Sequence, residues 1–248
     1  MLLLVFVLIA FFLLSQRKLQ QARQKAYAIE LEQREQRLYG TIQIQENERQ
    51  RIAKDLHDSI GSKLNVLHLY LHRLKKQVPS TPLISETVQD IFEVINTTLD
   101  TTRRISHDLL PPTLEKFGLK AALNEACTQY AKSSDTLQID FASPHEPYPR
   151  HDKMAELNLF RVMQELFSNS IKHGPATHIR VEMQYQNTKL HIYYSDNGPG
   201  FDPAADGYKP GLGLQNIESR MNMIGAQYAL NTAPSKGLEV QITYQPTL

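Results

Sequence analysis

The chain has 248 residues, which is enough for one or two domains with a substantial hydrophobic core. Its 27 lysines and arginines nearly balance 26 aspartates and glutamates, which argues against a protein that binds nucleic acid directly. The single cysteine, Cys127, excludes a disulfide framework or a cysteine-based zinc site built from one chain. We expect a packed thiol in a reducing compartment rather than a catalytic residue.

The first 14 residues, MLLLVFVLIAFFLL, are all apolar. As a helix they would span roughly 21 Å, less than the roughly 30 Å hydrocarbon core of a bilayer. A signal peptide fits less well, because no basic residue precedes the run and no small-residue cleavage site follows it. Basic residues follow before any acidic residue appears, namely Arg17, Lys18, Arg23 and Lys25. We therefore predict a membrane anchor over residues 1–14, either whole or the end of a longer helix, with the remaining chain in the cytoplasm.

Residues 15–45 are rich in glutamine, glutamate, arginine and lysine and contain no proline. A weak heptad seam runs through Leu19, Ala22, Ala26 and Ile29. Two interpretations stay open for this segment. It is a solvated helical linker, or it is a parallel coiled coil that carries a signal from the membrane.

Two long amphipathic helices follow. Apolar residues recur at helical spacing over 52–74 and again over 84–109, with a proline-punctuated turn between the two stretches. Pro111 and Pro112 end the second helix. A lone hairpin cannot bury both apolar stripes, so we predict that residues 46–112 form a homodimeric four-helix bundle.

The first of these helices contains the stretch RIAKDLHDSIG. Consecutive four-residue steps in the apolar seam around Leu56 form a stutter, which locally unwinds a coiled coil and leaves His57 at the bundle surface. Neutral imidazole has a lone pair that can attack phosphorus, and the carboxylate of Asp58 can accept a proton or stabilise the charge that develops. Neighbours on a helix do not automatically face each other, however. Taken alone, the pair indicates surface polar residues more readily than a nucleophile and its base.

The hydrophobic pattern changes to period two after residue 136. Alternating segments over 137–141, 179–183, 190–194, 228–232 and 238–244 predict half-buried strands of a largely antiparallel sheet. Helical patterns near 114–132, 152–173 and 213–225 interrupt them. Residues 113–248 are therefore predicted to form an α/β sandwich with helices on one face of the sheet, giving an α + α/β chain overall.

The predicted helix at 152–173 has two faces. Its apolar stripe contains Phe160, Met163, Leu166, Phe167 and Ile171. Glu165, Asn169 and Lys172 lie on the other side. This polar stripe is either a solvated surface or a site where a carboxylate and an amide oxygen bind Mg²⁺, with the lysine near anionic oxygens.

Two glycine-containing motifs come later in the chain. SDNGPGF at 195–201 places Asp196 where a strand meets a loop, and its carboxylate can accept a hydrogen bond from the amino group of adenine. A plain turn explains this motif when it is taken alone. GLGLQNIESR at 211–220 opens a helix whose glycine-rich N-terminus is suited to phosphates. The small, polar segment 202–210 between them is expected to act as a lid.

In this order, the motifs resemble a known family. The acidic and asparagine residues of the 152–173 helix, the D-x-G-x-G stretch and the G-x-G-L stretch resemble the N, G1 and G2 boxes of the Bergerat ATP-binding fold. ERQRIAKDLHDSIGSKL and RRISHDLLPPTLEKFGLKAAL resemble the dimerisation and phosphotransfer domain of sensor histidine kinases. The best match is the subfamily that partners response regulators with helix-turn-helix output domains. The resemblance covers residues 46–248.

The resemblance implies a role for each matching residue. His57 corresponds to the histidine that accepts the phosphoryl group and Asp58 to the adjacent acidic base, while Asn169 binds Mg²⁺ with Glu165 as its acidic companion. Nucleotide-binding residues implied in the same way are Asn169, Lys172, His173, Asp196, Gly198, Gly200, Gly211, Leu212, Gly213 and Leu214. The family implies ATP and Mg²⁺ as cofactors, autophosphorylation, and transfer to an aspartate in a response-regulator receiver domain. It also implies a homodimer at a bacterial inner membrane.

The chain departs from the family pattern at two positions. Leu238 stands where the family often has a threonine that helps to hold adenine, which puts that contact in doubt. Ser62 stands one helical turn after Asp58, where phosphatase-active relatives have glutamine or histidine. Two other functions therefore stay open, a nucleotide-binding pseudokinase scaffold and a Bergerat-fold serine kinase. The phosphotransfer hairpin argues against the second, because such kinases lack it.

Overall fold

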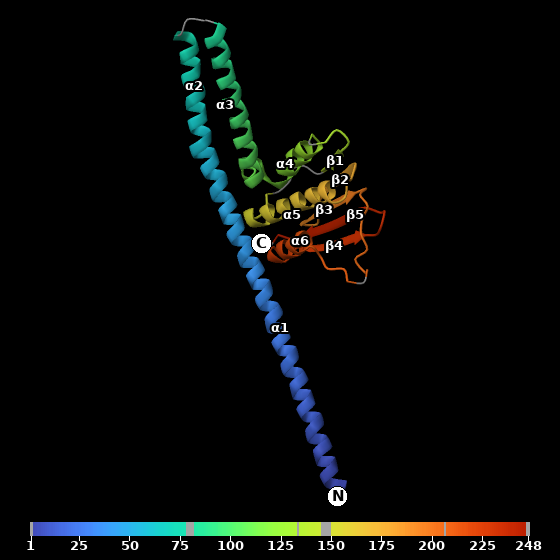
Figure 1. Cartoon of the computed structure of the whole chain (residues 1–248). Helices are drawn as coiled ribbons and strands as arrows, with labels where there is room; N and C mark the ends of the chain where they lie inside the picture. Colours follow the sequence, from blue (N-terminus) through green and yellow to red (C-terminus); the bar gives the residue numbers. More distant parts are fainter. Residues whose placement is uncertain (1, 78–81, 133, 145–149, 206, 247–248) are drawn as a thin grey trace. The chain divides into compact units, whose positions relative to one another are not determined.

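The computed structural model describes residues 2–77, 82–132, 134–144, 150–205 and 207–246 (Figure 1). The chain divides into two compact units, Met1–Ile44 and Gln45–Leu248. Helix α1 (Leu2–Asp55) accounts for all of the first unit that is described and continues into the second.

The expected membrane anchor over residues 1–14 is not supported. Among the residues that the structure describes, no helix combines the length and the apolar character that crossing a membrane requires. Residues 15–45 are helical, as both interpretations of this segment require, so the solvated linker and the coiled coil both stay open.

A π-helical turn, η1 (Leu56–Gly61), follows α1 directly and leads into α2 (Ser62–Gln77). A π turn closes i→i+5 hydrogen bonds and is therefore wider than an α turn. It lies where the four-residue steps around Leu56 predict a local unwinding of a coiled coil. His57 lies within this turn and is exposed in the single chain, as a position at the surface of a bundle requires.

Helix α3 (Pro82–Leu109) returns alongside η1 and α2 and ends just before the proline pair, as predicted (Figure 1). The predicted turn at Pro79 lies outside the described residues. Val88 and Ile95 of the apolar seam predicted for this helix are buried, whereas other residues of the seam are exposed in the single chain. Ile91 and Ile105 are 41% and 45% exposed, whereas Phe92 and Leu99 are buried. A second apolar face thus remains uncovered in the single chain.

Within the described residues the C-terminal sheet has five strands in the order β1-β2-β3-β5-β4. Their bounds are Gln138–Ala142 for β1, His178–Gln186 for β2, Lys189–Asp196 for β3, Gln227–Thr232 for β4 and Leu238–Tyr244 for β5. Strands β1 and β2 are parallel, and the other neighbours are antiparallel. The strands expected from the period-two pattern are all present.

Three helices cover one face of this sheet, as predicted. They are α4 (Pro112–Ala131), α5 (Lys153–Lys172) and α6 (Leu212–Met223). Alternate residues of β2, β3 and β5 are buried in the same apolar core as side chains from all three helices. Asp152 caps α5 by accepting hydrogen bonds from the backbone N–H groups of Met154 and Ala155 at 2.9 and 3.1 Å, which fixes where this helix begins.

Cys127 of α4 belongs to this core. Burial raises the pKa of its thiol to about 12, so the group is protonated at neutral pH. A protonated thiol in an apolar core is a poor nucleophile, and the prediction of a packed structural cysteine is confirmed.

Candidate functional site

The Asp196 carboxylate ends strand β3 and is held by three hydrogen-bond donors among the described residues. Ser170 donates its hydroxyl to Oδ2. The backbone N–H groups of Gly198 and Leu238 donate to Oδ1 at 2.9 and 3.2 Å. Leu238, which stands in place of the family threonine, has an aliphatic side chain without a hydroxyl, but its backbone N–H still contacts Asp196. The carboxylate is thereby fixed at the C-terminal end of the central strand, beside α5.

Gly200 lets the loop after β3 pack against the turn between β4 and β5. Its φ is 59°, and a Cβ atom there would lie 2.2 Å from the carbonyl oxygen of Ala233. Any other residue would force the two loops apart. The N–H of Phe201 also donates to Thr232 Oγ1 at 3.1 Å, which joins the same two segments. The position of Asp196 thus depends on the packing between the loop after β3 and the turn that joins β4 to β5, at the same end of the sheet.

Gly213 brings α6 against the polar face of α5. A Cβ atom at this position would lie 2.3 Å from Glu165 Oε1 and 3.3 Å from Asn169 Nδ2. The first turn of α6 therefore lies directly beside these two side chains, and the three predicted site residues come together. The backbone N–H groups in the first turn of α6, at the positive end of the helix dipole, are available to phosphate oxygens beside Glu165 and Asn169.

The residues on either side of Gly213 do not contact Glu165 or Asn169 in the same way. Nothing lies within 4 Å of a Cβ atom built on Gly211, and Leu212 is 76% exposed. Leu214 is half-buried and packs against the core. At the other end of the polar face, Lys172 and His173 are exposed, and neither side chain hydrogen-bonds within the described part of the chain.

Glu165 and Asn169 are suited to a hard cation. Both are half-buried, and neither side chain has a hydrogen-bond or ion-pair partner among the described residues. Their oxygens therefore remain free to bind. A carboxylate and an amide oxygen on adjacent turns, completed by water and phosphate oxygens, match the preference of Mg²⁺ for few protein ligands.

His57 and Asp58 stand apart from this cluster. Both are exposed on the π turn, and neither forms a side-chain hydrogen bond or ion pair within the described residues. Neither ring nitrogen of His57 is therefore hydrogen-bonded to another described residue. π turns recur at functional sites, and here the turn contains both residues of the predicted nucleophile and base pair.

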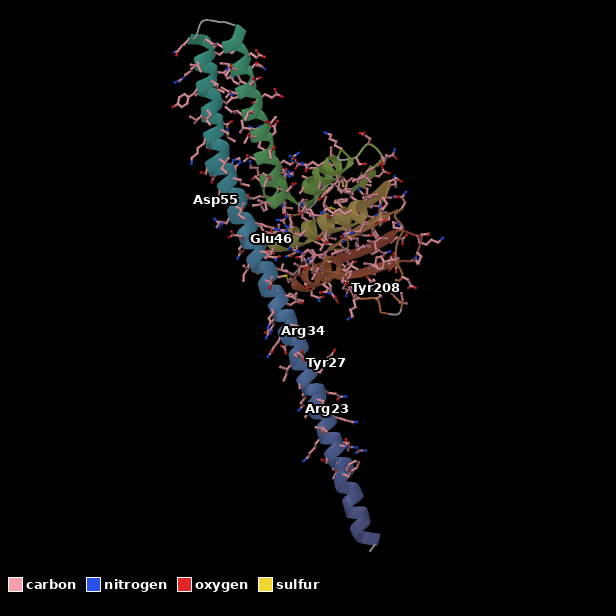
Figure 2. The ribbon with its side chains drawn as sticks, viewed as in Figure 1. Arg23, Tyr27, Arg34, Glu46, Asp55 and Tyr208 are labelled. Carbon is pink, nitrogen blue, oxygen red and sulfur yellow. The ribbon has the colours of Figure 1, made fainter. Side chains whose placement is uncertain are left out.

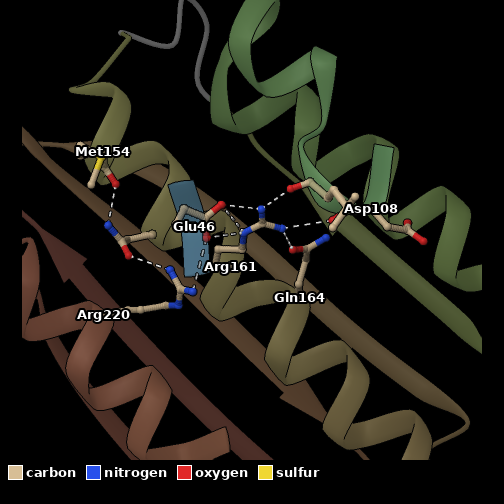
Figure 3. Close-up of polar contacts among 8 residues, drawn as sticks. Glu46, Asp108, Met154, Arg161, Gln164 and Arg220 are labelled. Carbon is tan, nitrogen blue, oxygen red and sulfur yellow. Dashed lines mark hydrogen bonds and ion pairs between the residues drawn. The ribbon is translucent and has the colours of Figure 1, made fainter. Parts of the chain in front are cut away.

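Two polar networks were not found from the sequence. In the first, the Tyr194 hydroxyl lies 2.7 Å from Ser170 Oγ, and both side chains are buried. In the second, Glu46 of α1 is buried against Arg161 of α5 and Arg220 of α6 (Figure 3). Glu46 and Asp55 are both labelled on α1 in Figure 2, and the nine residues that separate them correspond to about two and a half helical turns. An arginine next to the apolar stripe of 152–173 is the one sequence feature that could have pointed to this cluster.

Both domains match known protein families. Residues 48–114 match the family described as histidine kinase, and residues 154–248 match the histidine kinase-, DNA gyrase B- and HSP90-like ATPases. The chain therefore carries a histidine kinase domain followed by a histidine kinase-like ATPase domain, which confirms the resemblance seen in its motifs.

Curated relatives agree with this assignment. The chain is 30% identical over 229 residues to the signal transduction histidine-protein kinase/phosphatase DegS of Brevibacillus brevis, covering 89% of this chain and 57% of that protein. It is 34% identical over 187 residues to the sensor histidine kinase MctS of Rhizobium johnstonii, covering 73% and 39%. It is 29% identical over 221 residues to the oxygen sensor histidine kinase NreB of Staphylococcus carnosus, covering 85% and 63%. The chain thus spans less than two thirds of the length of each of these relatives.

Proposed function

We propose that the protein is a sensor histidine kinase that phosphorylates His57 from ATP and passes the phosphoryl group to an aspartate of a response regulator. The observation that carries this proposal is the convergence of Asp196, Asn169, Glu165 and the start of α6 in one site. An exposed histidine in the neighbouring domain supplies the acceptor.

Different elements of the site bind the base, the phosphates and the metal ion. Asp196 accepts a hydrogen bond from the adenine amino group, and its three protein donors hold it in place for that contact. The N–H groups at the start of α6 bind phosphate oxygens. Asn169 and Glu165 hold Mg²⁺, which when bound neutralises charge on the phosphates.

The transfer step itself involves the π turn. One ring nitrogen of His57 attacks the γ-phosphorus, a new N–P bond forms, and the bond from phosphorus to the ADP oxygen breaks. Asp58 accepts the proton from the other ring nitrogen or stabilises the positive charge there. The reaction requires the γ-phosphorus to come within about 3–3.5 Å of the attacking nitrogen.

The dimer belongs to the same proposal. Exposed apolar side chains line the hairpin at Ile60, Val66, Leu67, Leu69, Tyr70, Leu74, Ile91 and Val94. A second copy of the hairpin would remove them from water in a four-helix bundle. Light scattering of the purified chain gives the test, and a monomer at micromolar concentration would contradict this part of the proposal.

Membrane attachment and the regulator partner are further parts of the proposal. The apolar run over 1–14 and the basic residues after it support attachment, which fractionation of cells carrying the chain would test. The regulator is expected to carry a receiver domain and a helix-turn-helix output domain, as the subfamily resemblance implies.

The decisive experiment is incubation with γ-labelled ATP and Mg²⁺. Acid-labile, base-stable label on the chain that disappears in His57→Gln, while ATP affinity stays unchanged, is the expected result. ATP binding without any label would favour a pseudokinase scaffold instead. Acid-stable label on an added protein substrate would favour a serine kinase.

A further inference from the structure

We propose that Ser170 and Tyr194 are positioning residues for the adenine-reading carboxylate. A carboxylate only accepts hydrogen bonds, so the proton between Ser170 Oγ and Asp196 Oδ2 belongs to the serine. The single proton of the Tyr194 hydroxyl is donated to the carbonyl oxygen of Leu166 at 3.2 Å and can be shared with Ser170 Oγ, which lies 2.7 Å from the tyrosine oxygen. The buried tyrosine thus holds the serine against the backbone of α5, while the serine donates its own proton to Asp196.

Burial makes this set of hydrogen bonds an effective constraint. Ser170 is 4% exposed and Tyr194 is 2% exposed, whereas Asp196 is only half-buried and can meet a ligand. Water cannot replace the serine hydroxyl from behind, so Oδ2 has a single fixed donor on its buried side. The serine thus supplies a hydroxyl to the carboxylate at a site where Leu238 offers only its backbone N–H.

The fixed carboxylate affects which nucleobase the site binds. With Oδ2 held from behind, its remaining lone pair points toward the nucleotide in one direction. An adenine amino group can donate to it, whereas guanine has an acceptor oxygen at the same position. We infer that loss of Ser170 lowers affinity for ATP more than for GTP. This inference rests on the proposed role of Asp196.

The test compares Ser170→Ala with Ser168→Ala, a variant of a half-buried serine on the same helix that has no hydrogen-bond partner for its side chain among the described residues. Titration with ATP and GTP should show ATP affinity reduced by about tenfold in Ser170→Ala and the ATP preference narrowed, with little change in Ser168→Ala. Tyr194→Phe should give a smaller shift in the same direction. Equal losses for both nucleotides would mean a merely structural role and would overturn the inference.

Asp196→Asn in the same titration distinguishes the adenine contact of Asp196 from the positioning role of Ser170. If that variant loses its preference for ATP while Ser170→Ala keeps it, the positioning role fails and the adenine contact stands. If Asp196→Asn keeps the preference, the adenine contact itself fails, and the inference about Ser170 falls with it.

An independent observation supports a second inference, about the buried ion cluster. Glu46 is 3% exposed, and its Oε1 lies 2.6 Å from Arg161 Nη2 while its Oε2 lies 3.5 Å from Arg220 Nη2. Figure 3 shows the carboxylate between the two guanidinium groups. One acid therefore binds two elements of the ATPase domain to α1.

Arg161 also binds the end of α3. Its Nη1 donates to the carbonyl oxygen of Asp108 at 3.2 Å, and its Nη2 donates to that of Leu109. The last carbonyls of a helix have no partners within it and carry partial negative charge. Arg161 thus joins both helices of the hairpin, and Glu165 lies one turn further along the same face of α5.

We infer that this cluster is a latch that fixes the ATPase domain on the hairpin and has to open before His57 is phosphorylated. His57 lies eleven residues beyond Glu46, roughly 16 Å along the helix axis. A domain fastened at Glu46 holds its nucleotide at one position, whereas transfer needs contact between the phosphorus and the imidazole. A movement of α1 that withdraws Glu46 leaves two buried arginines without their carboxylate and favours release.

The full chain with Glu46→Gln tests this inference, with Glu48→Gln as the matched control. Glu48 is exposed, and among the described residues its ion-pair partner is Arg51 of its own helix, at 2.5 Å. In Glu46→Gln we expect faster hydrogen exchange at the end of α3 and in α5, unchanged ATP affinity and a severalfold faster autophosphorylation. Arg220→Met, which removes the longer of the two ion pairs, should shift exchange and rate less and in the same direction.

Two outcomes would overturn the latch. Slower autophosphorylation with unchanged ATP affinity would mean that the latched position is the productive one. Faster exchange with an unchanged rate would mean that the cluster only stabilises the fold. ATP affinity distinguishes this test from the test of the nucleotide site. It should fall in Asp196→Asn and stay unchanged in Glu46→Gln.

Discussion

Gly213→Ala offers a sharp test of the contact between α5 and α6. The added methyl group would lie 2.3 Å from Glu165 Oε1, whereas ordinary contact begins at 3.4 Å, so the carboxylate has to retreat by about 1 Å. A side-chain end can move this far at little cost in stability. Alanine is also a better helix former than glycine by about 0.5–1 kcal/mol, so the free energy of unfolding should not fall.

Catalysis should respond in the opposite way. A displacement of about 1 Å at a reacting site can lower a rate by about 10²-fold. We therefore expect autophosphorylation of Gly213→Ala, measured as single-turnover incorporation of labelled phosphate, to fall by about two orders of magnitude. Thermal unfolding followed by circular dichroism should give an unchanged or slightly higher midpoint.

Gly211→Ala is the matched control, because nothing lies within 4 Å of a Cβ atom at that position. Its backbone has φ −65° and ψ 167°, which alanine adopts without strain. This variant should keep most of its activity. Equal losses of activity in both variants, or none in Gly213→Ala, would refute the reasoning from the Glu165 contact.

Three other predictions follow from single residues. Asp58→Asn should fold and bind ATP but incorporate label more slowly by about 10²–10⁴-fold, measured as the initial rate, and an unchanged rate would exclude it as the base. The serine hydroxyl of Ser62 is too short to position water as glutamine does, so we expect weak dephosphorylation of a phosphorylated regulator and a gain in Ser62→Gln; fast loss of phosphate with the unaltered chain would contradict this. Burial lowers the pKa of His151, so the unfolded state takes up a proton first and stability is lost as pH falls below about 6.5. Denaturant titrations at pH 7.5 and 5.5 should show a smaller difference in His151→Phe than in the unaltered chain.

Much of the fold follows from local periodicity. Alternation along Leu190, Ile192 and Tyr194 identifies a strand with one buried face, and the prolines after Leu109 mark the end of a helix. The seam of α3 was harder to assign, because Phe92 faces the other helix of the hairpin while Ile91 faces outward. Two apolar stripes on one helix cannot be ranked by spacing alone.

The candidate site was less accessible to sequence reasoning where its contacts are distant in the chain. Motif spacing pointed to Asp196 and Asn169, but not to the donor behind the carboxylate, since Ser170 looks like any small polar residue on a helix. Arg161 is a stronger example. An arginine is ordinarily exposed, and the carboxylate that compensates the buried charge of Arg161 comes from Glu46, 115 residues earlier.

The buried thiol of α4 can report when the core of the ATPase domain opens. Because Cys127 is 3% exposed and has a pKa of about 12, a thiol reagent can modify it only when the core around α4 becomes accessible. With no other cysteine in the chain, the rate of modification then measures how often that region opens. Nucleotides that tighten the ATPase domain should slow the reaction, so ligand binding can be followed by mass spectrometry without attaching a probe.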